Sequence, residues 1–234
     1  MSLRHPPCDE GHSSIRNSAP ASLVDASQKS PQVAVTPSTR GETLAENTIL
    51  TLVGSLRAES VNSKFAEVAT AAAPEGTEVT TFAGLEEIPF YNEDLDVEGK
   101  VPAKAAELRA AVAAADGLLF VTPEYNGTMP AVLNNAIDWI SRPFGASSAT
   151  GTKAAVIGTS AGQYGGVWAH DDVRKSLKIA GAEVLEDATL AVGASYSRFA
   201  EVEPKDDAEV VEGIKNVLAS LAAPAAVLEA ASAN

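Results

Sequence analysis

Short apolar runs alternate with amphipathic stretches from residue 48 to residue 222, and this alternation constrains the fold more than any other feature. The apolar runs predict buried strands at residues 49–53, 78–82, 117–122, 154–159 and 183–192. The stretches between and after them have apolar side chains at helical spacing, which predicts helices at residues 63–73, 102–115, 130–141, 166–180 and 206–222. Strands and helices that alternate in this way form a parallel sheet with helices on both faces, so we expect an α/β fold.

Ligands of open parallel sheets bind outside the carboxyl ends of the strands, where the strand order reverses. The loops after the first, third and fourth predicted strands are therefore the places where we expect a site. Each of these loops is rich in small or conformationally rigid residues.

The composition excludes several classes of partner. The net charge is −14, from 17 basic and 31 acidic residues, which disfavours nucleic acid or an anionic membrane as a partner. No apolar run reaches the length of a membrane span. The single cysteine, Cys8, cannot form an internal disulfide, so we expect a cytoplasmic protein. The acidic surface is interpreted as a solubilising one, with a docking face for an electron-transfer partner as the alternative.

The ends of the chain differ in texture from its centre. Residues 1–46 are rich in Ser, Pro, Ala and Gln without periodicity, and they predict a disordered N-terminal extension. A transit peptide is the alternative, although acidic residues in this segment argue against it. His5, Cys8 and His12 are spaced irregularly, so no metal site is predicted. We expect one domain at residues 47–223 and a short C-terminal tail at residues 224–234.

The first loop, residues 54–63, lies between a predicted strand and the amino end of a predicted helix. Backbone N–H groups and the helix dipole attract anions to such a place, and Arg57 adds a positive charge suited to phosphate. The loop contains neither GxxxxGK followed by Ser or Thr nor GxGxxG, which excludes an NTPase loop and a dinucleotide fingerprint. We therefore predict a hydroxyl-rich cradle for one terminal phosphate, with plain helix capping as the alternative.

The other two loops have rigid or open backbones. Two prolines and a glycine shape residues 122–130, and Tyr125 is the candidate for contact with a flat ligand; packing of Tyr125 on its own loop is equally compatible with the sequence. Residues 160–166 contain three glycines, which allow the backbone to approach a ligand closely, although a flexible turn would have the same composition.

Three segments, GSLRAESVNSKFAEVA, TPEYNGTMPAVLNNAIDWISRP and GTSAGQYGG, resemble the NADPH-dependent FMN reductases. The resemblance covers about residues 48–192. It implies a flavodoxin-like, doubly wound five-stranded parallel sheet in the order 2-1-3-4-5, with FMN as cofactor and NADPH or NADH as co-substrate. It also implies a homodimer or homotetramer. Asn134 departs from the pattern, because relatives commonly have lysine there, which puts a subunit contact or the charge of the site in doubt.

The resemblance also implies which residues bind FMN. Residues of the first loop would hold the phosphate: Ser55, Arg57, Ser60, Asn62 and Ser63. Residues of the second loop would lie along the ring system: Pro123, Glu124, Tyr125, Asn126 and Gly127. Residues of the third loop would close the other side: Ser160, Gly162, Gly165 and Gly166.

The implied function is an NAD(P)H-dependent FMN reductase or quinone-type oxidoreductase. Hydride from NADPH would pass to bound FMN, and electrons would then pass to a small acceptor (flavin, quinone, azo compound or metal oxyanion) by a ping-pong mechanism. FMN carries this chemistry, so no catalytic residue is expected, and His170 is given a solvated or capping role. Two alternatives remain open: a flavodoxin-type electron carrier, and a protein with this fold that binds no flavin.

Overall fold

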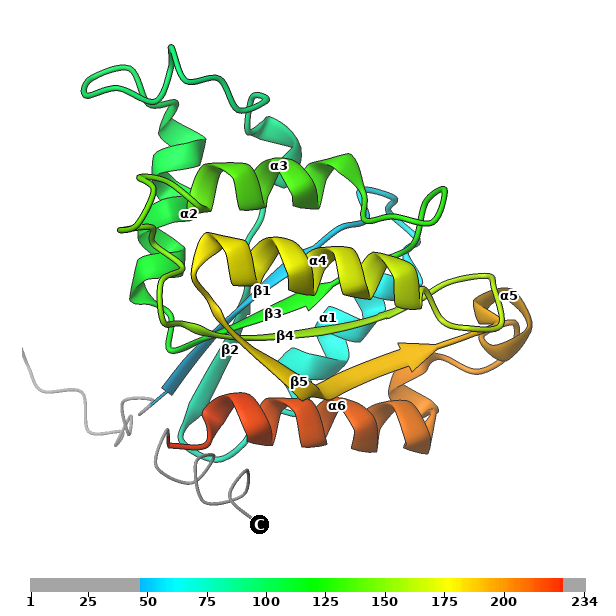
Figure 1. Ribbon diagram of the computed structural model, residues 1–234. Helices are drawn as coiled ribbons and strands as arrows, with labels where there is room; N and C mark the ends of the chain where they lie inside the picture. Colours follow the sequence, from blue (N-terminus) through cyan, green and yellow to red (C-terminus); the bar gives the residue numbers. More distant parts are fainter. Residues whose placement is uncertain (1–46, 225–234) are drawn as a thin grey trace, which may run out of the picture. The chain divides into compact units, whose positions relative to one another are not determined.

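A five-stranded parallel sheet forms the centre of the molecule, in a computed structural model that describes residues 47–224. Its order is β2-β1-β3-β4-β5, so the predicted fold class and strand order are confirmed (Figure 1). The strands are β1 (Asn47–Val53), β2 (Thr77–Thr81), β3 (Gly117–Val121), β4 (Lys153–Thr159) and β5 (Glu183–Val192).

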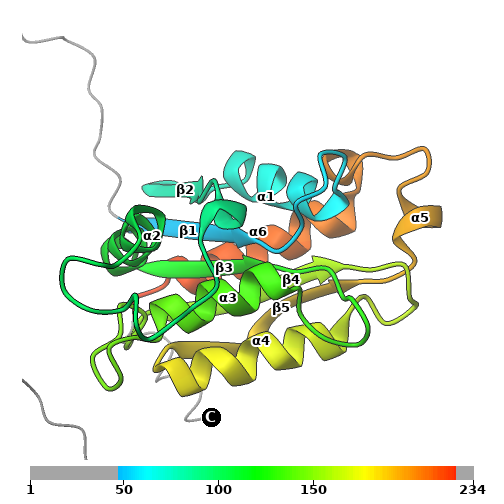
Figure 2. The same ribbon diagram turned by 90° about the horizontal axis from the view of Figure 1, so that it is seen from above.

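Helices cover both faces of the sheet (Figure 2). One face packs against α1 (Val61–Ala71) and α6 (Ala208–Ala222), and the other packs against α2 (Ala103–Ala114), α3 (Ala131–Ile140) and α4 (Val167–Ala180). Every residue of β3 and β4 is buried, because these central strands have a helix layer on each side. Phe65 on one face and Trp139 on the other are fully buried, and each contributes roughly 1.5–3 kcal/mol through burial.

Short elements between the main ones were missed by the sequence analysis. They are a 3-10 turn at Leu85–Glu87, the helix α5 (Ser195–Arg198) and a 3-10 turn at Pro204–Asp206. None of them is long enough to show a periodic apolar pattern. The helix predicted from residue 206 begins at Ala208, because the Asp207 side chain accepts the main-chain N–H groups of Glu209 and Val210 and so caps α6.

The predicted extension at residues 1–46, with His5, Cys8 and His12, lies outside the described residues, as does all but the first residue of the predicted tail. Between residues 47 and 224, no helix has the length and apolar character needed to cross a bilayer.

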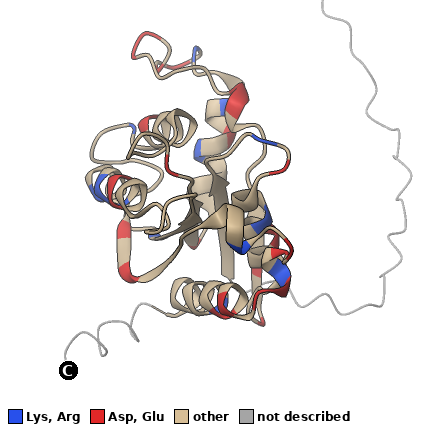
Figure 3. Ribbon diagram, turned by 90° about the vertical axis from the view of Figure 1, so that its right-hand side faces the viewer, with Lys and Arg blue, Asp and Glu red and all other residues tan. Residues whose placement is uncertain are grey.

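Main-chain hydrogen bonds continue the sheet beyond the carboxyl ends of its strands. The N–H of Gly54 donates to the carbonyl of Val121 at 2.8 Å, and the N–H of Thr122 donates to the carbonyl of Ile157 at 2.9 Å. The loops after β1, β3 and β4 therefore leave the sheet side by side. Figure 3 shows the molecule from the side on which β5 ends in Figure 1, with both acidic and basic residues on the ribbon there.

Candidate functional site

A cleft of about 490 Å³ opens at the carboxyl ends of the strands. Its walls come from residues 55–64, 123–125 and 159–161, which are the three loops singled out in the sequence, and from residues 195–199 after β5. Segments more than 100 residues apart in the sequence thus form one concave surface large enough for a cofactor.

Eight of the fourteen predicted site residues line this cleft. They are Ser55, Arg57, Ser60, Asn62, Pro123, Glu124, Tyr125 and Ser160. The other six are outside its lining: Ser63, Asn126, Gly127, Gly162, Gly165 and Gly166. Contact of any of the fourteen with FMN stays a prediction.

Several of the residues outside the lining make contacts that hold the loops in place. Ser63 donates its N–H to the Ser60 hydroxyl oxygen and lines a groove beside Thr81. The carbonyl of Gly162 accepts the N–H of Ala194 at 3.0 Å. Gly165 packs so tightly against β5 that a Cβ there would lie 2.6 Å from the main chain. These residues shape the loops around the cleft.

Asn134 lies on α3 and lines a second groove of about 540 Å³, which Tyr125, Asn126 and Asp138 also line. Its side-chain amide donates to the Asp138 carboxylate at 3.1 Å, while burial raises the pKa of that carboxyl. The position where relatives commonly have lysine therefore faces a neighbouring groove and not the cleft.

Residues of the first loop offer donors at the amino end of α1. Ser60 is the N-cap of α1, and its hydroxyl oxygen accepts the Ser63 N–H at 3.3 Å, which leaves the hydroxyl hydrogen for another acceptor. The Arg57 side chain lines the cleft and is exposed. Lys64 adds a second cation to the lining, next to the carboxylate of Glu203 at 2.7 Å.

Whereas the Arg57 side chain is exposed, the Asn62 side chain of this loop makes two hydrogen bonds within the protein. Its amide nitrogen donates to the Thr159 carbonyl at 3.1 Å, and its amide oxygen accepts the Thr159 N–H at 3.0 Å. The side chain is buried, so this pair locks the amino end of α1 to the carboxyl end of β4.

The second loop folds back on itself at Tyr125–Thr128, where the two main chains exchange hydrogen bonds of 3.0 and 3.1 Å. Asn126 and Gly127 between them have φ angles of 54° and 76°, the signature of a type I′ turn. The turn holds the Tyr125 side chain half exposed at the cleft.

The wall after β5 was not predicted, because ligands of open parallel sheets are expected where the strand order reverses, and β5 is an edge strand. Ser195, Tyr196 and Phe199 belong to it. The Ser195 N–H donates to the Ser160 carbonyl at 3.0 Å, and the Phe199 ring packs edge-on against Phe65. The sequence signal for this wall was Tyr196, an aromatic residue three positions after Gly193, which directly follows β5.

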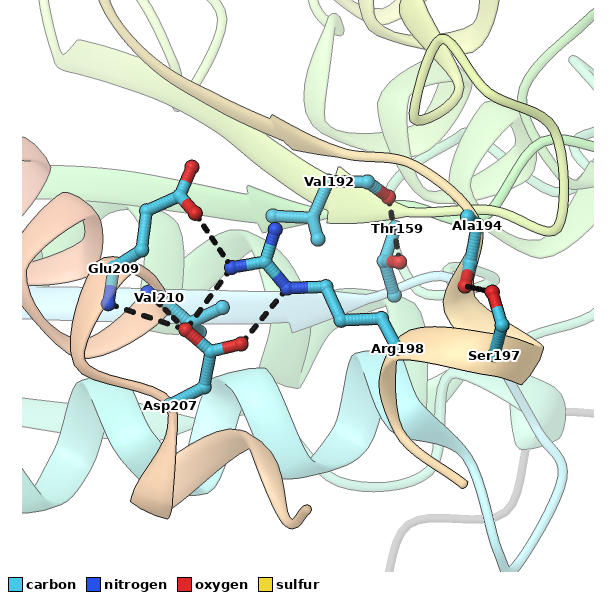
Figure 4. A network of polar contacts seen from close by, with 8 residues as sticks. All are labelled: Thr159, Val192, Ala194, Ser197, Arg198, Asp207, Glu209 and Val210. Atoms are coloured by element: carbon cyan, nitrogen blue, oxygen red, sulfur yellow. Dashed lines mark hydrogen bonds and ion pairs between the residues drawn. The ribbon is translucent and has the colours of Figure 1, made fainter. Parts of the chain in front are cut away.

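An ion-pair network fixes this wall to α6 (Figure 4). Nε of Arg198 donates to Oδ2 of Asp207 at 2.8 Å, and its Nη2 donates to Glu209 at 2.8 Å. The hydrogen bond to Asp207 raises the pKa of Arg198, and the same contact lowers the pKa of Asp207.

His170 lies on α4, and the solvated or capping role expected from the sequence is wrong. It is 1% exposed, so it is not solvated, and it lies inside α4, whose caps are Gly166 and Gly181. Burial, and secondarily the positive charge of Arg174, lowers its pKa to about 4. Among residues 47–224, its Nε2 has no hydrogen-bond partner. His170 is therefore neutral at physiological pH.

The donor set fits FMN. Exposed Arg57, the Ser60 hydroxyl and the amino end of α1 suit a phosphate dianion, while Pro123 and half-exposed Tyr125 suit a flat ring. Among residues 47–224, no cluster of His, Cys, Asp or Glu is placed to hold a metal ion.

Comparison with known proteins places the chain in a family. The family model described as NADPH-dependent FMN reductase matches residues 47–197. A 2-hydroxy-1,4-benzoquinone reductase of a Burkholderia species is 42% identical over 126 residues, which are 54% of this chain and 67% of that protein. A quinone reductase of Pseudomonas putida is 36% identical over 151 residues, which are 64% of this chain and 80% of that protein.

A solved structure shares the fold. It is FerB, a flavoenzyme NAD(P)H:(acceptor) oxidoreductase from Paracoccus denitrificans, with a TM-score of 0.66 and 28% identity over 75% of this chain and 94% of that one. The fold and the cleft thus define a flavodoxin-like flavoprotein. Within that class, the chain belongs to the NADPH-dependent FMN reductase family, so it is an oxidoreductase that uses FMN and NAD(P)H. This favours the reductase over the electron carrier.

Proposed function

We propose that the chain transfers electrons from NADPH or NADH to a small, flat acceptor of the quinone type, by way of FMN in the cleft. The observation that carries this proposal is one cleft that combines exposed Arg57 and the amino end of α1 with the half-exposed aromatic side chain of Tyr125. The names of the relatives, quinone reductases among them, support the acceptor class.

In this proposal Arg57, Ser55 and Ser60 hold the FMN phosphate, while Pro123, Tyr125 and Ser160 flank the ring system. FMN, when bound, supplies the two-electron redox chemistry, so the protein needs no nucleophile or acid–base pair of its own. The protein's part is to orient the ring, keep one side of it accessible, and neutralise the phosphate. Buried, neutral His170 takes no part in proton transfer near neutral pH.

We also propose a ping-pong mechanism, in which the oxidised nicotinamide leaves before the acceptor binds. One accessible ring side would have to serve donor and acceptor in turn. Initial rates measured over a grid of NADPH and benzoquinone concentrations should give parallel double-reciprocal lines, whereas intersecting lines would exclude this order. Free FMN, an azo dye and chromate, tested in the same assay, rank the acceptor classes.

The decisive experiment for the function begins with the absorbance spectrum of the purified full-length protein. Bound flavin that bleaches on anaerobic addition of NADPH, and recovers its colour when benzoquinone is added, supports the proposal. Protein that stays colourless and does not bind micromolar FMN contradicts it.

The assembly and cellular location are proposals as well. We propose a homodimer or homotetramer in the cytoplasm, whose FMN-binding domain is residues 47–223. Light scattering coupled to size-exclusion chromatography measures the assembly, and a monomer at micromolar concentration would contradict it.

A further inference from the structure

Glu124 caps a helix that is far from it in the sequence. Its Oε2 accepts the N–H of Trp168 at 3.1 Å and the N–H of Ala169 at 3.2 Å, both in the first turn of α4. The local sequence of α4 offers no such cap, since its N-cap is Gly166 and its first turn contains no acidic residue. The carboxylate of Glu124 therefore satisfies two N–H groups that the helix itself leaves free.

Two further contacts tie the same loop to the same helix. The Thr128 hydroxyl donates to the Asp172 carboxylate at 2.5 Å. Gly127 lies against the Trp168 ring, because a Cβ added to this glycine would lie 3.4 Å from it. The segment 124–128 is thus attached to α4 both before and after Tyr125.

The position of the Tyr125 ring follows from these attachments. The main chain of Tyr125 pairs with that of Thr128, and its side chain is half exposed at the cleft. The Tyr125 ring belongs to this turn, and the turn is hydrogen-bonded to α4 through Glu124 and Thr128. We propose that Glu124 is a positioning residue, whose carboxylate fixes Tyr125 against the amino end of α4 and thereby sets the fit of the flavin ring. This inference rests on the proposed function, and it gives Glu124 a role other than contact with the ring.

The first arm of the test needs no ligand. Hydrogen–deuterium exchange of residues 122–130 is measured in the wild type, in Glu124→Ala and in Glu124→Gln. We expect about tenfold faster exchange in Glu124→Ala, the scale of a lost helix cap. Glu124→Gln should stay near the wild type, because its amide oxygen still accepts the two N–H groups. Unchanged exchange in Glu124→Ala would overturn the proposal.

The second arm measures FMN dissociation constants by quenching of flavin fluorescence. Glu124→Ala should weaken FMN about tenfold, and Glu124→Gln should restore most of the affinity. In a Tyr125→Ala background the Glu124→Ala change should have little further effect, because Glu124 acts through Tyr125. An equal loss of affinity with and without the tyrosine ring would overturn the proposed route.

Two controls separate positioning from general destabilisation. Glu78→Ala removes an exposed carboxylate near the amino end of β2, away from the cleft. Val217→Ala opens the core under α6 and lowers stability without touching the cleft. An FMN affinity of Val217→Ala as low as that of Glu124→Ala would show a merely structural effect. A wild type that binds no FMN would overturn the proposed function, and the exchange arm would still decide whether Glu124 holds the turn.

Discussion

Arg57 is the exposed cation of the first loop, and its contribution to FMN binding can be measured directly. Arg57→Ala should weaken FMN by about 1.5–3 kcal/mol, the usual worth of a charge-assisted hydrogen bond. Since the side chain is exposed, we expect the lower end of this range, and a smaller loss at 0.5 M salt. Isothermal titration at two salt concentrations checks this, with exposed Lys100→Ala as the control. Unchanged FMN affinity in Arg57→Ala would remove Arg57 from the site.

His170 links the stability of the fold to pH. Its pKa is about 4 in the folded protein and about 6.5 in the unfolded chain. Between these two pH values the unfolded state therefore binds a proton that the folded state does not bind. The free energy of unfolding should therefore fall as the pH falls from 6.5 to 4, by roughly 3 kcal/mol from this residue. Urea unfolding of the wild type and of His170→Gln across this range isolates the contribution. Equal pH dependence in the two proteins would contradict it.

At the scale of elements, two glycines in different loops should respond differently to substitution. Gly127 and Gly165 both lie outside the cleft lining. Both have positive φ angles, yet a Cβ at Gly165 would lie 2.6 Å from the main chain of β5, while one at Gly127 would make ordinary contact with Trp168.

Gly127→Ala should therefore cost about 1 kcal/mol of stability, from its backbone conformation alone. Gly165→Ala should cost more, because the third loop must also move away from β5. Thermal unfolding of the two variants measures the order. A greater loss in Gly127→Ala would contradict the packing of the third loop on β5.

At the scale of the whole molecule, the fold was largely predictable and the site only partly. The five strands were predicted from apolar runs, because strands buried between two helix layers have nearly continuous apolar sequences. Their order was predicted from the family resemblance. The hydrogen bonds of Asn62 and Glu124 and the burial of His170 did not follow, since each depends on segments brought together by the tertiary fold. The wall after β5 was missed for the same reason: α5 is four residues long and has no periodic signature.

Ligand binding should also stabilise the whole molecule. FMN at one hundred times its dissociation constant should add about 2.7 kcal/mol to the free energy of unfolding and raise Tm by roughly 5–10 °C. Riboflavin lacks the phosphate, so it should raise Tm much less at the same concentration. Differential scanning fluorimetry with both ligands checks this, and equal shifts would contradict a phosphate site at the first loop.

The pairing of Asn62 with Thr159 has a consequence for ligand choice. Its two hydrogen bonds join the start of α1, next to the first loop, to the end of β4, which leads into the third loop. In the proposed binding mode, this connection holds the loop predicted to bind the phosphate at a set distance from the third loop, which is predicted to lie beside the flavin ring. We therefore expect flavins with a shorter or longer chain between ring and phosphate to bind more weakly than FMN, because they cannot reach both loops at once.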